Sequence, residues 1–513
     1  MMASSPPVEP PEAVPAEADG LPLDVLVVGA GLAGVGAAAE YLRSLPDRRV
    51  AVLESRAALG GTWDLFRYPG VRADTDMFTL GYRIRPWRDP RAMLDGASIR
   101  RYIEETAVET GVLPLIRFNR RVTALAWSSA EAMWTVTVQQ TGPGAGEEEV
   151  QGSIETLRAR FVHCCTGYYR YARGHRPQFP GETDFAGRFV HPQRWPQDLD
   201  WAGKRVVVIG SGATAVTLVP ALAERAAQVT QLQRSPSYVV SRPVLDPVAR
   251  VLAPWLPARV AYALVRWSCI LGSVATFALA RALPRRIGAR LVRMAADELP
   301  RGYAVERHFR PDYAPWDQRI CAVPGGDLFR AIREGRVEMV TDRIERFVAD
   351  GIRLESGRVL PADLVVTATG LEILPLGGAQ VTVDGEPLRL PETMVYRGAM
   401  LSGVPNLVLT MGYTNASWTL RADLISQYVV RLLRRLQHRR CDYLVAQRDP
   451  GVRERPLIDF SSGYVRRAAD VLPRQGDRFP WRVHQNYLRD LIVTRYSRLE
   501  DRALQWRRRA APP

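Results

Sequence analysis

A glycine-rich turn near the start of the chain has the residue types of a diphosphate site. The turn reads Gly29-Ala30-Gly31-Leu32-Ala33-Gly34. Gly29 permits a tight turn, Gly31 lets a pyrophosphate approach the backbone, and Gly34 lets a helix pack closely on a strand. Glu54 follows 20 residues after Gly34, the spacing at which a carboxylate hydrogen-bonds the ribose of a dinucleotide. The pattern predicts that this stretch binds a dinucleotide.

A second turn of the same kind differs at its ribose position. It reads Gly210-Ser211-Gly212-Ala213-Thr214-Ala215 and runs into Val216. The strand expected at 228–233 ends without an acid and is followed by Arg234-Ser235. An acid there would repel a 2′-phosphate, whereas Arg and Ser would bind one. We therefore expect FAD in the first unit and NADPH in the second.

Short strands and helices must position both turns. Residues 24–28 and 205–209 are β-branched apolar runs, typical of buried parallel strands. Residues 35–45 and 216–223 favour helices, and 50–53 favours a further strand. This alternation predicts an α/β fold with two dinucleotide-binding, Rossmann-like domains.

The stretch after Glu54 has the composition of a functional loop. It contains two glycines, a proline and several aromatic residues between Leu59 and Asp74. Arg72, Asp74 and Asp76 could face the reactive end of a cofactor, although each charge taken alone is more typical of solvated surface.

Composition is that of an ordinary soluble globular protein, with 513 residues, 47% hydrophobic and 24% charged. The net charge of +15 comes almost entirely from scattered arginines, so it indicates solvated surface rather than a nucleic-acid site. The six histidines form no ligand-spaced set with cysteines or acids, so no metal site is expected.

Five cysteines without a preceding secretion signal indicate a reducing, cytoplasmic environment. Cys164 and Cys165 invite a redox interpretation, but adjacent cysteines are poorly placed to close a disulfide ring beside a flavin. We interpret them as small buried residues.

A motif between the two units resembles a known family fingerprint. The pattern FxGxxxHxxxWP is present at Phe185, Gly187, His191, Trp195 and Pro196 and is similar to that of type I Baeyer–Villiger monooxygenases. Related flavin N- and S-oxygenases usually carry Tyr or Phe in place of Trp195. Further stretches resemble the ethionamide-activating members of this superfamily, at 61–70, 315–319, 412–420 and 485–490. The resemblance covers nearly the whole chain from about residue 23.

The resemblance implies an FAD- and NADPH-dependent monooxygenase. Such an enzyme uses NADPH to reduce the flavin and O2 to form a flavin C4a peroxide. It inserts one oxygen atom into ketones, giving esters or lactones, and also oxygenates organosulfur compounds. The expected partners are therefore a small-molecule ketone or organosulfur substrate and O2.

The resemblance also implies site residues. Arg319 matches the active-site arginine of the family, and Asp74 matches the acid that holds it. His191 and Trp195 are implied to couple the domains rather than react. Many family members carry Lys where this chain has Gln318, which shifts 2′-phosphate recognition toward Arg234. The expected cofactor contacts are Gly29, Gly31, Ala33, Gly34, Glu54, Thr62, Trp63, Asp64, Leu65, Arg72, Asp74, Val122, Gly210, Ser211, Gly212, Ala213, Thr214, Ala215, Val216, Arg234 and Ser235.

The NADPH domain is expected to be inserted into the FAD domain. Residues 161–167 and 364–370 each read as an apolar strand that ends in Thr-Gly. These two ends indicate where the chain crosses between the FAD domain and the NADPH domain. Residues 117–127 and 134–139 favour antiparallel strands, with a hairpin at 142–152. The predicted bounds are 1–20 for a disordered tail, 21–170 and 366–513 for the FAD domain, and 171–365 for the NADPH domain with a helical insert at 247–318.

The apolar helix expected at 260–283 raises the question of a membrane. Arg266 and Arg281 leave only 14 uninterrupted residues between them. At about 1.5 Å per residue this is roughly 21 Å, short of the roughly 30 Å hydrocarbon core of a bilayer. A buried helical insert is the favoured prediction, and peripheral membrane contact is the alternative.

Three other functions stay open. One is a flavin oxygenase acting on nucleophilic N or S without carbonyl chemistry, which Trp195-Pro196 disfavours. A second is a flavin-dependent reductase of quinones or disulfides, which the cysteine arrangement disfavours. The third is a non-catalytic nucleotide-binding redox protein.

Overall fold

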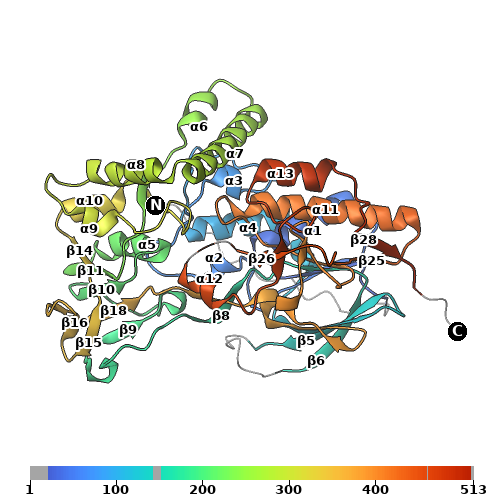
Figure 1. Cartoon of the computed structure of the whole chain (residues 1–513), viewed down its shortest axis with the longest axis horizontal. Coiled ribbons are helices and arrows are strands. Elements are labelled where there is room, and N and C mark those ends of the chain that lie inside the picture. Colours follow the sequence, from blue (N-terminus) through green and yellow to red (C-terminus); the bar gives the residue numbers. More distant parts are fainter. Residues whose placement is uncertain (1–20, 143–151, 459, 461, 510–513) are drawn as a thin grey trace.

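Two sheets, one mixed and one fully parallel, lie side by side along the length of the molecule, with a helical projection above them (Figure 1). The computed structural model describes residues 21–142, 152–458, 460 and 462–509. The tail predicted at 1–20 and most of the hairpin predicted at 142–152 lie outside these residues. The α/β fold with two Rossmann-like units is confirmed.

The first sheet positions the first glycine turn. Strands β1 and β2 pair in parallel, and β1 also pairs in parallel with β7. Three helices pack on one face of this sheet, and a five-stranded sheet of order β21-β20-β4-β5-β6 covers the other. The strands in spatial order are β22 (Val395–Tyr396), β23 (Met400–Leu401), β24 (Leu407–Leu409), β7 (Val162–Cys164), β1 (Val25–Val28), β2 (Val50–Leu53) and β3 (Ile116–Arg117). The covering elements are α1 (Leu32–Ser44), α4 (Gly96–Glu109), α11 (Trp418–Arg439), β4 (Arg120–Ser128), β5 (Met133–Gln140), β6 (Ile154–Ala159), β20 (Gln380–Val383) and β21 (Glu386–Pro387).

The second sheet positions the second glycine turn. Its central strand β10 pairs in parallel with β11 and β18. Helices α5 and α10 pack on one face, and a three-stranded antiparallel sheet lies on the other. The strands in spatial order are β14 (Val337–Thr341), β11 (Gln228–Gln233), β10 (Arg205–Ile209), β18 (Leu364–Thr367) and β9 (Arg188–Val190). The flanking elements are α5 (Ala213–Leu222), α10 (Asp327–Arg333), β15 (Ile344–Val348), β16 (Gly351–Leu354) and β17 (Val359–Pro361).

Two antiparallel strands connect the units. Strand β8 (Tyr169–Gly174) leaves the first sheet after β7, and β19 (Leu371–Ile373) returns to it after β18. Both follow the two Thr-Gly ends of the sequence. Because β18 continues to Thr367, the second sheet extends past the boundary at 365 expected from the sequence.

Both helices that follow the glycine turns begin three residues earlier than predicted, at Leu32 and at Ala213. Their N-caps are Gly31 and Gly212, which have no side chain to accept a capping hydrogen bond. The first N–H groups of each helix therefore belong to the turn itself, where an anion would approach.

The helical insert projects from the body of the molecule (Figure 1). It comprises α6 (Pro247–Leu252), α7 (Ala258–Ala282), α8 (Pro284–Asp297) and α9 (Val305–Phe309). The expectation that its long helix is buried is wrong, because only 22% of the most apolar stretch of α7 is buried. By length and composition α7 could span a membrane, and no other described helix could. Its inner side packs on α3 (Met77–Leu80), whereas nothing covers its outer side among the described residues.

Candidate active site

The first glycine turn has the shape of a diphosphate cradle. Gly29 has φ +102°, and a Cβ on Gly34 would lie 1.8 Å from the Gly29 carbonyl oxygen. A Cβ on Gly31 would lie 3.5 Å from the Gly61 Cα, so the backbone of Gly31 packs beside the Gly60-Gly61 turn. Ala33 is buried on α1 behind the turn. These residues fit a diphosphate at the N-terminus of α1.

Glu54 lies at the carboxyl end of β2, beside this turn, and is 4% exposed. Its carboxylate accepts hydrogen bonds from the N–H of Ala30 at 2.7 Å and of Arg56 at 2.9 Å. Burial raises the pKa of Glu54, and these two donors partly offset that rise. Glu54 Oε1 also accepts from the Ser55 hydroxyl at 3.3 Å, whereas Oε2 accepts only from Ala30 among the described residues and keeps a further lone pair for a ribose hydroxyl.

The loop residues expected at the cofactor form the short helix α2 (Thr62–Leu65). Gly60 bridges to Gly31, which places α2 beside the first turn. Asp64 is 2% exposed and binds Arg56 at 2.6 Å and Arg67 at 3.0 Å. Arg100 lies 3.8 Å away as well, so the Asp64 carboxylate has three cationic partners within the protein. Thr62, Trp63 and Leu65 are only half-buried.

Val122 lies buried on β4, where its side chain joins the core between the first sheet and the covering sheet. The start of β4 is tied to Glu54, because the N–H of Arg120 donates to the Glu54 carbonyl at 2.8 Å. The main chain of β4 therefore runs past the ribose position. A cofactor contact at Val122 would use that main chain.

The second turn is open at the point where a phosphate would enter. Gly210 has φ +145°, and a Cβ on Gly212 would meet no described atom within 4 Å. Ala213, Thr214, Ala215 and Val216 form the first turn of α5. The Ser211 hydroxyl accepts from Ser237 at 3.0 Å. Arg234 and Ser235 are exposed directly after β11, so both side chains can receive a phosphate.

The structure brings Arg319 and Asp74 together from positions 245 residues apart. Arg319 Nη1 donates to Asp74 Oδ2 at 3.2 Å, and about one third of each side chain is exposed. Burial disfavours the guanidinium charge, but Asp74 and the neighbouring tyrosines together outweigh it, so the pKa of Arg319 is raised. Trp316, three residues earlier, has φ +71°, and such backbone strain is concentrated at functional sites.

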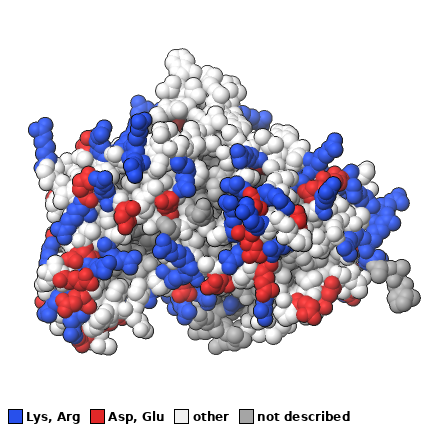
Figure 2. Space-filling model, in the orientation of Figure 1, with Lys and Arg blue, Asp and Glu red and all other residues white. Residues whose placement is uncertain are grey.

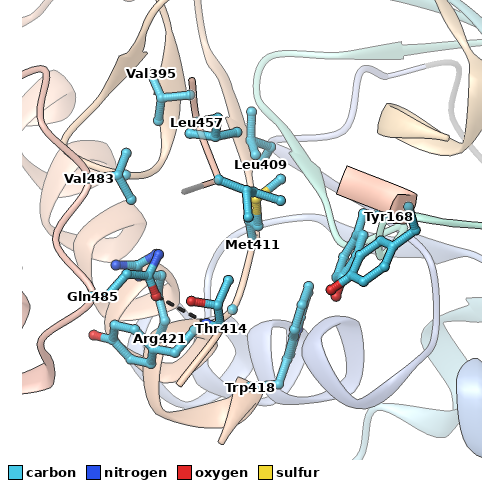
Figure 3. Close-up of a pocket in the computed structure, with 15 residues that line it drawn as sticks. Tyr168, Val395, Leu409, Met411, Thr414, Trp418, Arg421, Leu457, Val483 and Gln485 are labelled. Carbon is cyan, nitrogen blue, oxygen red and sulfur yellow. Dashed lines mark hydrogen bonds between the residues drawn. The ribbon is translucent and has the colours of Figure 1, made fainter. Parts of the chain in front are cut away.

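An apolar cavity of about 500 Å³, counting its open mouth, lies at the carboxyl ends of β7 and β24 (Figure 3). Tyr168 and Trp418 stack on each other at one side of it, with ring centroids 5.2 Å apart. At one end Gln485 accepts from the N–H of Thr414 at 3.0 Å. The walls are mainly apolar and include Val395, Leu409, Met411, Leu457, Ile458, Tyr464 and Val483. Such a cavity suits an uncharged organic molecule.

Arg319 acts electrostatically on the phenols of this cavity. Burial raises the pKa of Tyr168 and Tyr464, and the Arg319 charge works in the opposite direction at both. Burial likewise raises the pKa of Tyr169 to about 12, and its hydroxyl lies 3.0 Å from that of Tyr168. A fixed positive charge therefore faces a neutral aromatic wall.

The fingerprint residues pack around the crossing strands rather than toward the cavity. A Cβ on Gly174 of β8 would lie 2.0 Å from the His191 ring. Trp195 packs edge to face on Trp201, with centroids 5.8 Å apart, and Phe185 is buried beneath β18. The sequence missed Gln193, whose amide donates to the β8 carbonyls of Arg170 and Tyr171 at 2.7 and 2.9 Å.

Arg72 lies at the junction of the two units. Its guanidinium binds Asp327 at the start of α10, at 2.5 and 3.2 Å. Phe66 and Tyr68 of the same loop are buried in the core of the second unit. A Cβ on Gly70 would lie 2.8 Å from the Thr217 carbonyl of α5, so the loop packs tightly there.

All five cysteines are free thiols. Burial raises the pKa of Cys164 to about 12 and also raises that of Cys165. Protonated thiols are poor nucleophiles, which argues against disulfide reductase chemistry. In the described part of the chain, no group of three or more His, Cys, Asp or Glu residues could hold a metal ion.

Solved structures of other proteins share this fold. A steroid monooxygenase bound to NADP matches with TM-score 0.68 and 24% identity, covering 83% of this chain and 88% of that one. An open cyclohexanone monooxygenase matches with TM-score 0.67 and 18% identity, covering 83% and 90%. The chain thus has the fold of two-domain, nucleotide-binding monooxygenases.

Sequence comparison gives the family. Residues 27–88 match the NAD(P)-binding Rossmann-like domain, and 88–251 match flavin-binding monooxygenase-like proteins. The FAD-containing monooxygenase EthA of Mycobacterium tuberculosis is 50% identical over 96% of this chain and 99% of that protein. EthA of Mycolicibacterium smegmatis is 48% identical over 95% and 98%. The chain belongs to the family of FAD-containing monooxygenases.

Proposed function

We propose that this monooxygenase depends on FAD and NADPH and inserts one oxygen atom from O2 into small ketones. We propose the same site for oxygenation of thioamide or sulfide sulfur. The observation that supports this function best is the Arg319–Asp74 pair beside a cavity of apolar and aromatic side chains.

The two glycine turns support one binding site for each cofactor. FAD would be held by the Gly29–Gly34 turn, the N-terminus of α1 and Glu54. NADPH would be held by the Gly210–Val216 turn, with Arg234 and Ser235 on its 2′-phosphate. FAD, when bound and reduced by NADPH, would activate dioxygen.

Arg319 is the proposed catalytic residue. Oxygen transfer to a ketone places negative charge on the former carbonyl oxygen. A guanidinium stays charged at any working pH and can stabilise that charge without reorganising. Asp74 orients the guanidinium. The cavity walls around Tyr168 and Trp418 would hold the ketone and exclude water.

Product analysis tests the proposal. Purified holoenzyme is given NADPH, ¹⁸O₂ and either a cyclic ketone or a thioether. The expected products are a lactone with one ¹⁸O atom and a sulfoxide. Sulfoxide without lactone would make the protein an N/S-oxygenase, and NADPH oxidation without any oxygenated product would overturn monooxygenation of these substrates. The five free cysteines fit a reducing compartment such as the cytoplasm.

A further inference from the structure

The outer side of α7 is a continuous apolar stripe. Its exposed side chains recur every three or four residues, which places them on one helix face. They are Val260, Ala263, Leu264, Trp267, Leu271, Ala275, Ala278, Leu279 and Ala282. The stripe extends for roughly 33 Å at about 1.5 Å per residue. Val251 and Trp255, which is 84% exposed, extend it onto the tip beside α6.

Positive charge predominates around this stripe, although α8 ends at the exposed Asp297. Residues 247–296 contain eight arginines and no aspartate, glutamate or lysine. Arg266 is buried and Arg281 binds Asp317. The other six are exposed and form no ion pair with any described residue: Arg250, Arg259, Arg285, Arg286, Arg290 and Arg293. In Figure 2 the tip above the body is a white, uncharged surface, with blue side chains below it.

The inner side of α7 belongs to the body of the enzyme. Arg266 donates to the carbonyls of Phe78 at 2.6 Å and Gly81 at 3.0 Å. Phe277 packs edge to face on Trp316, with ring centroids 5.8 Å apart, and Arg281 binds Asp317 at 2.7 Å. These contacts hold the segment that leads to Arg319. The helix therefore stays on the protein surface rather than crossing a bilayer.

We propose that α6, α7 and α8 form a docking surface for a lipid bilayer that contains anionic lipids. The helix α7 would lie in the plane of the interface with its apolar stripe among the acyl chains. The six exposed arginines would meet the lipid phosphates. A second copy of this chain fits less well, because two such faces would bring arginines against arginines.

The first test is sedimentation of the full-length holoenzyme with vesicles. One set contains phosphatidylcholine alone, and the other contains added phosphatidylglycerol. We expect at least about tenfold tighter binding to the anionic vesicles, weakened by salt, because each arginine near the surface contributes several-fold. Failure to sediment with either set would overturn the proposal.

Variants then locate the surface. Leu264→Gln with Leu271→Gln should abolish sedimentation, while Ile154→Gln, at an exposed apolar site on β6, should not change it. Arg285→Gln with Arg290→Gln should weaken the preference for anionic lipid several-fold, and Arg353→Gln should leave it unchanged. FAD content and NADPH oxidation should be unchanged in all of them, which shows that they fold.

Two other outcomes would overturn the proposal. Vesicle binding that persists in the Leu264 and Leu271 variant would place the contact elsewhere. A wild-type dimer that becomes a monomer in that variant, without vesicle binding, would show that a second copy covers the stripe.

Discussion

Arg319 and Arg234 differ in how the protein surrounds them, and this difference separates their proposed roles. Arg319 is held by Asp74 beside half-buried tyrosines, so its charge is fixed before substrate arrives. Arg234 is exposed at a strand end. Its side chain is available to a phosphate that the protein does not itself supply.

Arg319→Ala should uncouple the two halves of the reaction. Removal of one preorganised donor from a site of charge development lowers the rate by on the order of 10²–10³. We expect FAD and NADPH to bind, NADPH to be consumed and hydrogen peroxide to replace the oxygenated product. Asp74→Asn should have a smaller effect because the guanidinium charge remains. Near wild-type ester formation by Arg319→Ala would remove the residue from the catalytic role.

Arg234→Ala should weaken NADPH selectively. A charge-assisted hydrogen bond contributes about 1.5–3 kcal/mol, which corresponds to roughly a tenfold to hundredfold rise in KM for NADPH. Steady-state kinetics with NADPH and NADH measure this, with Arg225→Ala as an exposed control in the same unit. Equal losses with both coenzymes would mean that Arg234 has a structural role.

At the scale of elements, His163 joins three parts of the first unit. It lies on β7 and is completely buried. One ring nitrogen lies 2.6 Å from the Tyr41 hydroxyl on α1, and the other lies 2.7 Å from the Thr410 hydroxyl after β24. The neutral ring can accept one hydrogen bond and donate the other. His163 therefore holds the carboxyl ends of β7 and β24 together, where they border the cavity.

His163 should make stability depend on acid. Burial lowers its pKa to about 3, whereas the unfolded value is about 6.5. The unfolded chain therefore binds more protons in this window. The contribution of His163 is complete above about pH 6.5 and is lost as the pH falls toward 3, by up to about 1.4 kcal/mol per pH unit.

Urea unfolding at a series of pH values measures this slope, which is how steeply the free energy of unfolding changes with pH. His163→Gln should flatten it between about pH 6 and 4. His438→Gln removes an exposed histidine and should leave it unchanged. A wild-type slope in the His163 variant would assign the acid sensitivity to other groups.

At the scale of the whole molecule, the loop after Glu54 couples the two units. Phe66 and Tyr68 enter the core of the second unit, and Arg72 binds Asp327. The sequence predicts a cofactor contact at Arg72, which stays a prediction, and in the structure the Arg72 guanidinium binds an acid of the second unit. The relative placement of the two glycine turns therefore depends on this junction.

A double-mutant cycle on Arg72→Ala and Asp327→Ala should show coupling of at least about 0.5 kcal/mol in the free energy of unfolding. We expect a higher KM for NADPH and a lower kcat, with FAD retained. The exposed pair Arg205 and Asp363 is the control and should contribute less than about 1 kcal/mol. Loss of FAD from Arg72→Ala alone would instead support a direct cofactor contact.

The sequence by itself determined the local elements of both units. The strands β1, β2, β10 and β11 are present where apolar runs predicted them. Glycine is needed at position 29 because φ is positive there, and at position 34 because the carbonyl of Gly29 leaves no room for a side chain. Both reasons are local, so the spacing of the glycines in the sequence is enough to predict the turn. Tyr168 was missed, although its place directly after a parallel strand and Thr-Gly is a signal for a ligand site.

Only the tertiary structure decided the contacts between distant segments. It joined Arg319 to Asp74, built the cavity from segments between Tyr168 and Gln485, and paired Arg72 with Asp327. It also left α7 exposed where its apolar sequence favoured burial. An apolar side chain is more stable in contact with other apolar groups. Whether it is buried depends on how many neighbouring side chains the rest of the protein places around it. That number is set by the packing of elements far apart in sequence.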